Sequence, residues 1–292
     1  MAIFVDKDTR LVVQGLTGSE GRFHGLRNRA YGTSLVAGVT PGKGGQDVEG
    51  VPVLDTVVDA VQEHGANTAM VFVPAPFAAD AIYEAIDAGV HTVITITEGV
   101  PAHEMLRIHG YARARGVRTL GPNCPGALSP GKANVGIIPA EIFTEGSIGL
   151  VSRSGTLTYQ IGHELTQMGL GNSTIVGIGG DPVIGSSFID VIALFEQDPE
   201  TELIVMVGEI GGDEEERTAE YIAEHVTKPV VAYIAGFQAP PGKRMGHAGA
   251  IISGSSGTAQ AKAEALEAKG VPVGRNPTEA ARLAAEKVGA KA

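Results

Sequence analysis

Runs of aliphatic and β-branched residues alternate with amphipathic stretches along nearly the whole chain. Before residue 121 the pattern predicts strands at 11–14, 34–39, 69–73, 92–97 and 117–120 and helices at 19–30, 55–63, 77–87 and 101–115. After residue 126 it predicts strands at 148–152, 173–178, 202–208 and 229–234 and helices at 155–167, 187–196, 214–225, 257–269 and 277–288. The strands are apolar on both faces, which is typical of parallel sheets covered by helices.

A turn-rich segment, residues 121–126, separates the two halves of this pattern. We therefore predict two α/β domains with open, doubly wound sheets, a Rossmann-like domain of residues 1–123 and a flavodoxin-like domain of residues 124–292. Apolar residues make up 43% of the 292 residues, which is enough to build a core in each half. The 41 glycines gather at the ends of apolar runs, where α/β proteins form ligand sites.

Charge and cysteine content exclude several classes of protein. The net charge of −11 argues against a nucleic-acid partner, because phosphate backbones require clustered Lys and Arg. Cys124 is the only cysteine, so no intramolecular disulfide can form. The N-terminus lacks the pattern of a signal peptide and no apolar run approaches the ~20 residues of a membrane span, so we expect a cytoplasmic protein without membrane contact.

A glycine-rich loop joins the first predicted strand to the first helix. Gly15, Gly18 and Gly21 follow a G-x-x-G-x-x-G spacing, which differs from the dinucleotide fingerprint G-x-G-x-x-G. Such a loop can present backbone amides and the positive end of a helix dipole to a phosphate. On its own, the loop is explained equally well as a tight turn without a ligand.

The second predicted strand ends without the acidic residue that binds the ribose of NAD. Lys43 follows this strand between glycines and suits a phosphorylated ribose, as in NADP or coenzyme A, although a solvated loop lysine also fits. Two further strands are followed by residues 73–76 and 96–99, at the edge where such sheets bind ligands. Neither loop requires a ligand: turn formation explains the prolines of the first, and Glu98 in the second could cap a helix. No P-loop is present, so an ATP-dependent reaction would need a nucleotide site on another chain.

The second half contains two hydroxyl-rich segments, residues 152–158 and 253–258, each of which precedes a predicted helix. Both can cradle an anion at the helix N-terminus, and both can equally act as ordinary N-caps. Between the last predicted strand and the second of these segments lies a long loop that contains Gly246-His247-Ala248-Gly249-Ala250. Loops of this length are uncommon unless they are functional or disordered.

His247 is the best candidate for a nucleophile. An imidazole nitrogen can attack phosphorus, and the small residues on both sides leave room for a reagent. Glu209, at the end of an apolar strand, is the best candidate to orient the other ring nitrogen, although it could instead cap a helix. The eight histidines show no metal-ligand spacing, so we predict no metal site.

Together these segments resemble the α subunits of succinyl-CoA synthetases (succinate–CoA ligases, ADP- or GDP-forming). The shared motifs occur in the order of the family and extend over nearly the whole chain, at residues 17–20, 42–45, 121–126, 152–159 and 242–250. The last two motifs are highly specific. Glu20 departs from the family pattern, in which glutamine is common.

The resemblance implies a role for each motif. Coenzyme A would be bound by Thr17, Gly18, Ser19, Glu20, Lys43, Ile96, Thr97 and Glu98, with Asn123 and Cys124 near its thiol end. Tyr159 would help to form the carboxylate site, and the phosphate would be cradled by Ser154, Gly155, Ser255 and Ser256. His247 would be phosphorylated and Glu209 would orient its ring.

The resemblance also implies the reaction succinate + CoA + NTP ⇌ succinyl-CoA + NDP + phosphate, through a phosphohistidine, as in the tricarboxylic acid cycle. ATP or GTP, with Mg²⁺, would bind to a β subunit with an ATP-grasp domain, in an αβ or α2β2 assembly. Three alternatives remain: a malate–CoA ligase subunit, an NADP-dependent oxidoreductase and a non-catalytic CoA-binding module. The missing dinucleotide fingerprint weighs against the second, and the intact set of His247, Glu209 and Ser154 weighs against the third.

Overall fold

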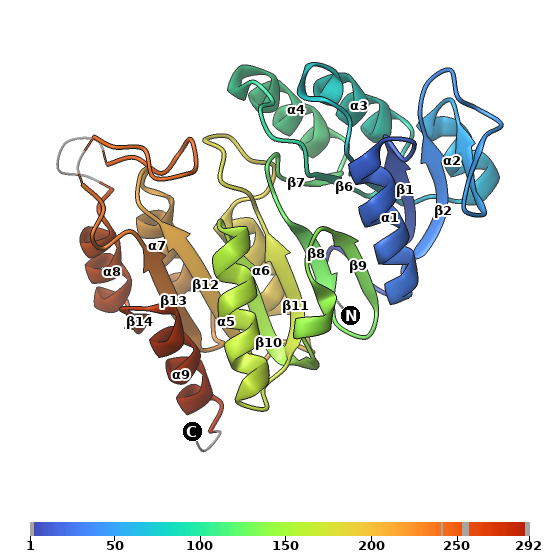
Figure 1. Ribbon diagram of the computed structural model, residues 1–292. Helices are drawn as coiled ribbons and strands as arrows, with labels where there is room; N and C mark the ends of the chain where they lie inside the picture. The colour runs from blue at the N-terminus through green and yellow to red at the C-terminus, as the bar shows by residue number, and fades with distance from the viewer. Residues whose placement is uncertain (1–2, 241, 253–256, 290–292) are drawn as a thin grey trace.

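The computed structural model describes residues 3–240, 242–252 and 257–289, which form two seven-stranded sheets with helices on both faces of each (Figure 1). The first sheet has the order β3-β4-β2-β1-β5-β6-β7. Its strands are β1 (Arg10–Gln14), β2 (Ser34–Val39), β3 (Asp47–Val48), β4 (Val51–Leu54), β5 (Thr68–Val71), β6 (Thr92–Thr95) and β7 (Arg118–Leu120). All neighbours in this sheet run parallel except β3 and β4.

Helices of the first half pack on both faces of this sheet. One face is covered by α1 (Ser19–Tyr31), and the other by α2 (Val57–His64), α3 (Ala75–Asp87) and α4 (Ala102–Ala114) (Figure 1). β1 lies between β2 and β5, so successive connections leave it toward opposite sides of the sheet. Doubly wound sheets bind ligands at the carboxyl ends of the strands at such a switch point.

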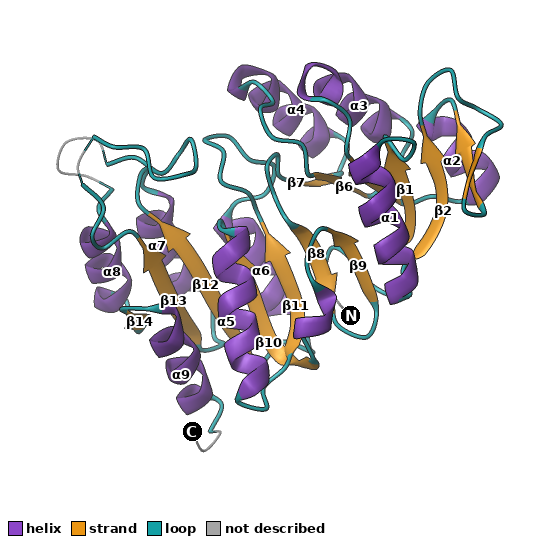
Figure 2. Cartoon of the chain, in the orientation of Figure 1, coloured by secondary structure: helices purple, strands orange, loops and turns teal. Residues whose placement is uncertain are grey.

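The second sheet has the order β14-β13-β12-β10-β11-β8-β9. Its strands are β8 (Gly126–Ser129), β9 (Ala133–Gly136), β10 (Glu145–Ser152), β11 (Asn172–Gly177), β12 (Leu203–Glu209), β13 (Val230–Ala235) and β14 (Val273–Gly274). One face is covered by α5 (Gly155–Gln167) and α9 (Pro277–Lys287), and the other by α6 (Phe188–Gln197), α7 (Glu214–His225) and α8 (Ala259–Ala268) (Figure 2). A short 3-10 helix, η1 (Ala140–Ile142), precedes β10.

The alternating pattern of strands and helices read from the sequence is confirmed, and α5 and α7 match their predicted bounds residue for residue. Parallel strands form the centre of both sheets, as predicted, but the edges also contain antiparallel strands that were not predicted. β8 and β9 pair antiparallel with each other, and β8 also pairs antiparallel with β11. These strands are short and rich in Gly, Ala and Ser, so they lack the apolar run that identifies a strand in a sequence.

The two halves meet at β8 and β9, every residue of which is buried. Asn28 Nδ2 on α1 donates to the carbonyl oxygen of Gly136 at 3.1 Å, and Thr33 Oγ1 donates to that of Asn134 at 2.8 Å. The predicted domain boundary between residues 123 and 124 lies between the end of the first sheet at Leu120 and the start of the second at Gly126. None of the helices in the described ranges is long and apolar enough to cross a membrane.

Candidate functional site

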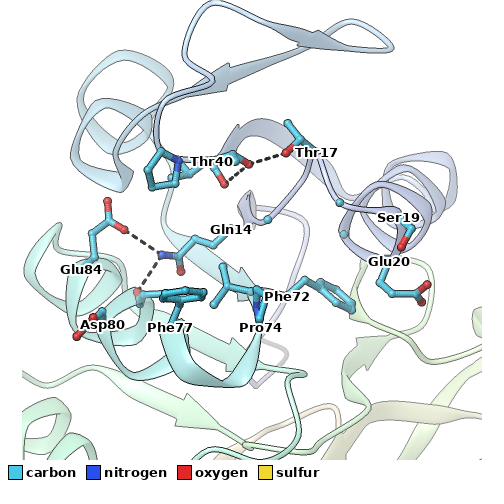
Figure 3. Close-up of a pocket in the computed structure, with 17 residues that line it drawn as sticks. Gln14, Thr17, Ser19, Glu20, Thr40, Phe72, Pro74, Phe77, Asp80 and Glu84 are labelled. Atoms are coloured by element: carbon cyan, nitrogen blue, oxygen red, sulfur yellow. Dashed lines mark hydrogen bonds between the residues drawn. The ribbon is translucent and has the colours of Figure 1, made fainter.

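A pocket of ≈ 840 Å³ opens at the carboxyl ends of β1, β2 and β5, at the switch point of the first sheet (Figure 3). Phe72, Pro74 and Phe77 supply apolar surface on one side, and Thr17, Ser19 and Glu20 come from the loop and first turn that lead into α1. A pocket of this size, with apolar walls and a few polar groups, is typical of a site for a cofactor or cosubstrate.

The glycine loop brings the backbone of α1 close to β1. A Cβ atom on Gly21 would lie 2.3 Å from the carbonyl oxygen of Gly15, so no larger residue fits there without a shift of the loop. The N-cap of α1 is Gly18, which provides no side-chain hydrogen bond to the helix. The first-turn amides of α1 can therefore serve an anionic ligand, with the helix dipole in the favourable direction.

Lys43 lies at the edge of this loop. Its Nζ donates to Thr17 Oγ1 at 3.2 Å, and Thr17 Oγ1 donates to Thr40 Oγ1 at 3.1 Å. The side chain of Lys43 is exposed, so its charge remains available to a ligand. The structure thus brings Lys43 next to the residues 17–20 with which the sequence associated it.

Residues 96–98 lie beside this pocket but are not among the described residues that line it. The hydroxyl of Thr97 donates to the carbonyl oxygen of Val73 at 2.7 Å, which joins the loop after β6 to the loop after β5. Ile96 is half-buried and Glu98 is exposed. In this structure Thr97 therefore supports the wall of the pocket from behind.

Asn123 and Cys124 lie between the two halves, after β7. Asn123 Nδ2 donates to Asp181 Oδ1 at 3.0 Å. Cys124 is only 3% exposed, and its thiol donates to the carbonyl oxygen of Thr95 at 3.3 Å. Burial raises the pKa of Cys124 to about 12, so the thiol is neutral and enclosed.

His247 and Glu209 are in direct contact, as the sequence suggested. His247 Nδ1 lies 2.7 Å from Glu209 Oε2, and the side chains are 28% and 7% exposed. The loop that carries His247 lies beyond the carboxyl ends of β12 and β13 (Figure 1). The ring rests against the backbone of Gly180, where a Cβ atom would lie 2.2 Å from Cγ of the imidazole. The alternative that Glu209 is only a helix cap does not fit this geometry.

The surroundings of His247 favour a positive ring. The hydrogen bond to Glu209 raises the pKa of His247 above its ordinary value, and burial opposes this rise. The negative charges of Glu209 and Asp181 also raise the pKa, whereas the positive charge of Arg153 lowers it. When Nδ1–H donates to Glu209, the electron pair of the neutral ring lies on Nε2. Nε2 is then the nucleophilic atom, and Glu209 can stabilise the cationic ring that forms when Nε2 attacks.

The first hydroxyl-rich segment begins α5. Ser154 is the N-cap, with its Oγ accepting from the amide of Leu157 at 3.3 Å, so the ordinary capping role is present.

Tyr159 is half-buried one turn further on, and its hydroxyl lies 3.7 Å from the position of a Cβ atom on Gly155. Burial raises the pKa of Tyr159 to about 12, so it is a neutral hydrogen-bond donor. Ser255 and Ser256 lie outside the described residues.

Several residues at these sites were not singled out from the sequence. Gln14, Phe77, Asp80 and Glu84 line the first pocket, the last three from α3, and only the tertiary structure turns that helix toward the pocket. Asp181, Arg153 and Glu214 surround the His247–Glu209 pair. The first two of these follow β11 and β10, and their positions after strand ends could have identified them. Among the described residues, no group of three or more His, Cys, Asp or Glu side chains is placed to hold a metal ion.

Two family models match separate parts of the chain. Residues 6–99 match the family of CoA binding domains, and residues 151–272 match the CoA-ligase family. A solved structure of ATP citrate lyase from Methanothrix soehngenii, in complex with citrate and coenzyme A, superposes with a TM-score of 0.85 at 26% identity. The alignment covers 99% of this chain and 52% of that one.

Two curated relatives are similar over almost their full length. The α subunit of succinate–CoA ligase [ADP-forming] from Aquifex aeolicus is 61% identical over 279 residues, which cover 95% of this chain and 92% of that protein. The α subunit 2 of the ADP-forming enzyme from Archaeoglobus fulgidus is 58% identical over 286 residues, which cover 98% and 99%. The chain therefore belongs to the family of succinate–CoA ligase α subunits.

Proposed function

We propose that this chain and a β subunit together catalyse the reversible reaction succinate + CoA + NTP ⇌ succinyl-CoA + NDP + phosphate, with the phosphoryl group carried on Nε2 of His247. The observation that carries the proposal is the 2.7 Å contact between His247 Nδ1 and Glu209 Oε2. It leaves the second ring nitrogen as the nucleophile and provides a carboxylate for the resulting charge. The curated relatives are ADP-forming, which favours ATP as the nucleotide.

The reaction has three bond exchanges. Nε2 attacks the γ-phosphorus of the nucleotide and NDP leaves; the nucleotide and its Mg²⁺ are held by the ATP-grasp domain of the β subunit. A carboxylate oxygen of succinate then attacks the phosphorus of the phosphohistidine, and the N–P bond breaks. Finally the CoA thiol attacks the carbonyl carbon of succinyl phosphate, the C–O bond to phosphate breaks, and the thiol proton passes to the departing phosphate. Nδ1 keeps its proton throughout and donates it in a hydrogen bond to Glu209, whose negative charge favours the cationic ring of the phosphohistidine.

CoA occupies the pocket at the switch point of the first sheet. The family match covers this domain, and the amides of residues 18–20 together with Lys43 provide the positive groups that CoA phosphates need. Ile96, Thr97 and Glu98 support the same site, and the reactive thiol end lies toward Asn123 and Cys124. Burial keeps the thiol of Cys124 neutral and enclosed, so that residue takes no covalent part in the reaction.

The acid and the phosphoryl group bind near the start of α5. Ser154 and Gly155 provide the N-terminal turn for the phosphate, and the neutral hydroxyl of Tyr159 donates to the succinate carboxylate. Ser255 and Ser256 lie outside the described residues, and their assignment to the phosphate rests on the family alone. Because the nucleotide binds on the other subunit, the His247 loop moves between the two sites. Membership of this family removes the NADP-dependent oxidoreductase from consideration.

The test is to incubate the αβ complex with γ-labelled ATP and to follow the label on the α chain. We expect an acid-labile, base-stable label that is lost in His247→Asn and retained in His225→Asn, a control histidine exposed on α7. A label that persists in His247→Asn would contradict the proposal. Comparison of turnover with succinate and malate then identifies the acid.

A further inference from the structure

A buried cluster of charged side chains lies behind the His247–Glu209 pair. Arg153, which follows β10, forms an ion pair with Glu214 on α7, and the two side chains are 11% and 13% exposed. Glu214 Oε1 accepts from the amide of Phe188 at 2.9 Å, so the start of α6 fixes the carboxylate on its other side. The guanidinium of Arg153 therefore has a defined position in the interior.

The same guanidinium faces the second oxygen of Glu209. Arg153 Nη1 lies 3.7 Å from Glu209 Oε1, while Oε2 of Glu209 contacts the imidazole of His247. Glu209 Oε1 is buried and has no hydrogen-bond partner within the described ranges. A buried carboxylate oxygen in this situation requires a nearby positive charge, and Arg153 supplies one.

A second ion pair supports the backbone of Glu209. Lys262 on α8 is fully buried and pairs with Glu215 on α7. Glu215 Oε1 accepts from the amide of Glu209 at 3.0 Å. Burial raises the pKa of Glu215, and the positive charges of Lys262 and Arg153 oppose that rise. Side chain and backbone of Glu209 are thus both held by charged groups that follow β10 or lie on α7 and α8.

The charges around the ring oppose one another. Glu209 and Asp181 favour a protonated ring, which has no electron pair for attack on phosphorus. The nearby carboxylates of Glu214 and Glu215 are paired with Arg153 and Lys262. Arg153 is the positive group that counters Glu209 and Asp181. A nucleophilic ring nitrogen must be unprotonated in part of the molecules and still basic enough to bond to phosphorus. Negative charges that raise the pKa and a positive charge that lowers it together meet this requirement.

We propose that Arg153 is a positioning residue for the phosphohistidine reaction, acting on His247 through the carboxylate of Glu209, and that Glu214 holds Arg153 in place. The inference deepens the proposed function, since its effect on rate presupposes that His247 is phosphorylated. The effect of Arg153 on protonation of the His247 ring does not presuppose phosphorylation, because this protonation can be measured in the resting complex.

The first measurement uses no turnover. Diethyl pyrocarbonate acylates neutral imidazole, so the rate of acylation of the His247 peptide, followed by mass spectrometry across pH, gives the midpoint of ring protonation. In Arg153→Met we expect this midpoint to move to higher pH, because a positive charge has been removed. Arg153→Lys, which keeps the charge, should leave the midpoint close to that of the wild type. Arg217→Met, an exposed arginine paired with Asp213, is the matched control and should not move the midpoint.

The second measurement is the rate of His247 phosphorylation by labelled ATP in the same αβ complexes. We expect roughly a tenfold or larger loss of this rate in Arg153→Met, by analogy with residues that orient a histidine ligand of a metal.

An unshifted midpoint in Arg153→Met, with or without a slower rate, would overturn the inference, because the role would then be structural only. If Arg153→Met does not assemble, Arg153→Gln, which also removes the charge, replaces it under the same criteria: a midpoint at higher pH with slower phosphorylation supports the inference, and an unshifted midpoint overturns it. Absence of label in the wild type would instead refute the proposed function and leave the titration result standing.

Discussion

Histidine and cysteine side chains are both potential nucleophiles, and their surroundings in this fold give them opposite properties. His247 is partly exposed, lies in a loop of small residues and contacts a carboxylate. Cys124 also lies in a turn of conspicuous sequence, but it is enclosed between the two halves of the molecule. The sequence supplied the residue types and left their reactivity open, because reactivity depends on burial and on neighbouring charge.

Cys124 should therefore resist alkylation in the native protein. We expect iodoacetamide at neutral pH to leave it unmodified, because its side chain is 3% exposed and burial raises its pKa to about 12. The single cysteine makes intact-mass spectrometry unambiguous. Complete labelling in denaturant is the positive control, and stoichiometric labelling of the folded complex would show that the thiol is accessible.

At the scale of single elements, the connection from β1 to α1 determines the shape of the larger pocket. Gly15 and Gly21 allow the start of the helix to approach the strand end, and the helix then directs its first amides into the pocket. The sequence predicted this loop and the helix after it. It did not predict the contribution of α3, because the residues that line the pocket from α3 belong to an otherwise ordinary amphipathic helix.

Gly21→Ala should weaken CoA binding more than it lowers stability. The new methyl group would lie 2.3 Å from the carbonyl oxygen of Gly15, so the loop must shift away from its present position. We expect the affinity for CoA, measured by calorimetry on the αβ complex, to fall roughly 10–100-fold. Gly110→Ala in α4 is the control, since no atom lies within 4 Å of its Cβ position; affinity should be unchanged and stability should rise by about 0.5–1 kcal/mol. Equal affinity in both variants would show that the loop adapts.

On the scale of the whole molecule, the two halves form a continuous structure through β8 and β9. Polar groups of α1 and of the segment after it bond to the backbone of β9, and Ser129 Oγ on β8 donates to the carbonyl oxygen of Val5 at 2.7 Å. Asn123 and Asp181 bond across the same boundary, on the side of the His247 site. The relative position of the pocket in the first half and of His247 in the second thus depends on buried hydrogen bonds between residues far apart in sequence.

Asn28→Ala should destabilise the chain by about 1–3 kcal/mol, because it leaves the carbonyl oxygen of Gly136 buried without its partner. Urea denaturation is the measurement. Gln62→Ala, at an exposed position of α2, should change the free energy of unfolding by no more than about 0.5 kcal/mol. A loss in Asn28→Ala no greater than in this control would mean that the contact adds nothing to the joining of the two halves.

The sequence by itself determined the local features of this protein: the alternation of parallel strands and helices, the glycine loop, the His247 loop and the family. These follow from periodicity, turn residues and short motifs, which act within a few residues of one another. The tertiary structure alone decided what depends on distant residues, including the antiparallel strands β8 and β9, the pocket wall from α3 and the burial of Cys124. It also placed Arg153, Glu214 and Lys262 behind Glu209. These residues come from distant parts of the chain, and only folding brings the ends of β10 and β12 together with α7 and α8 around the imidazole of His247.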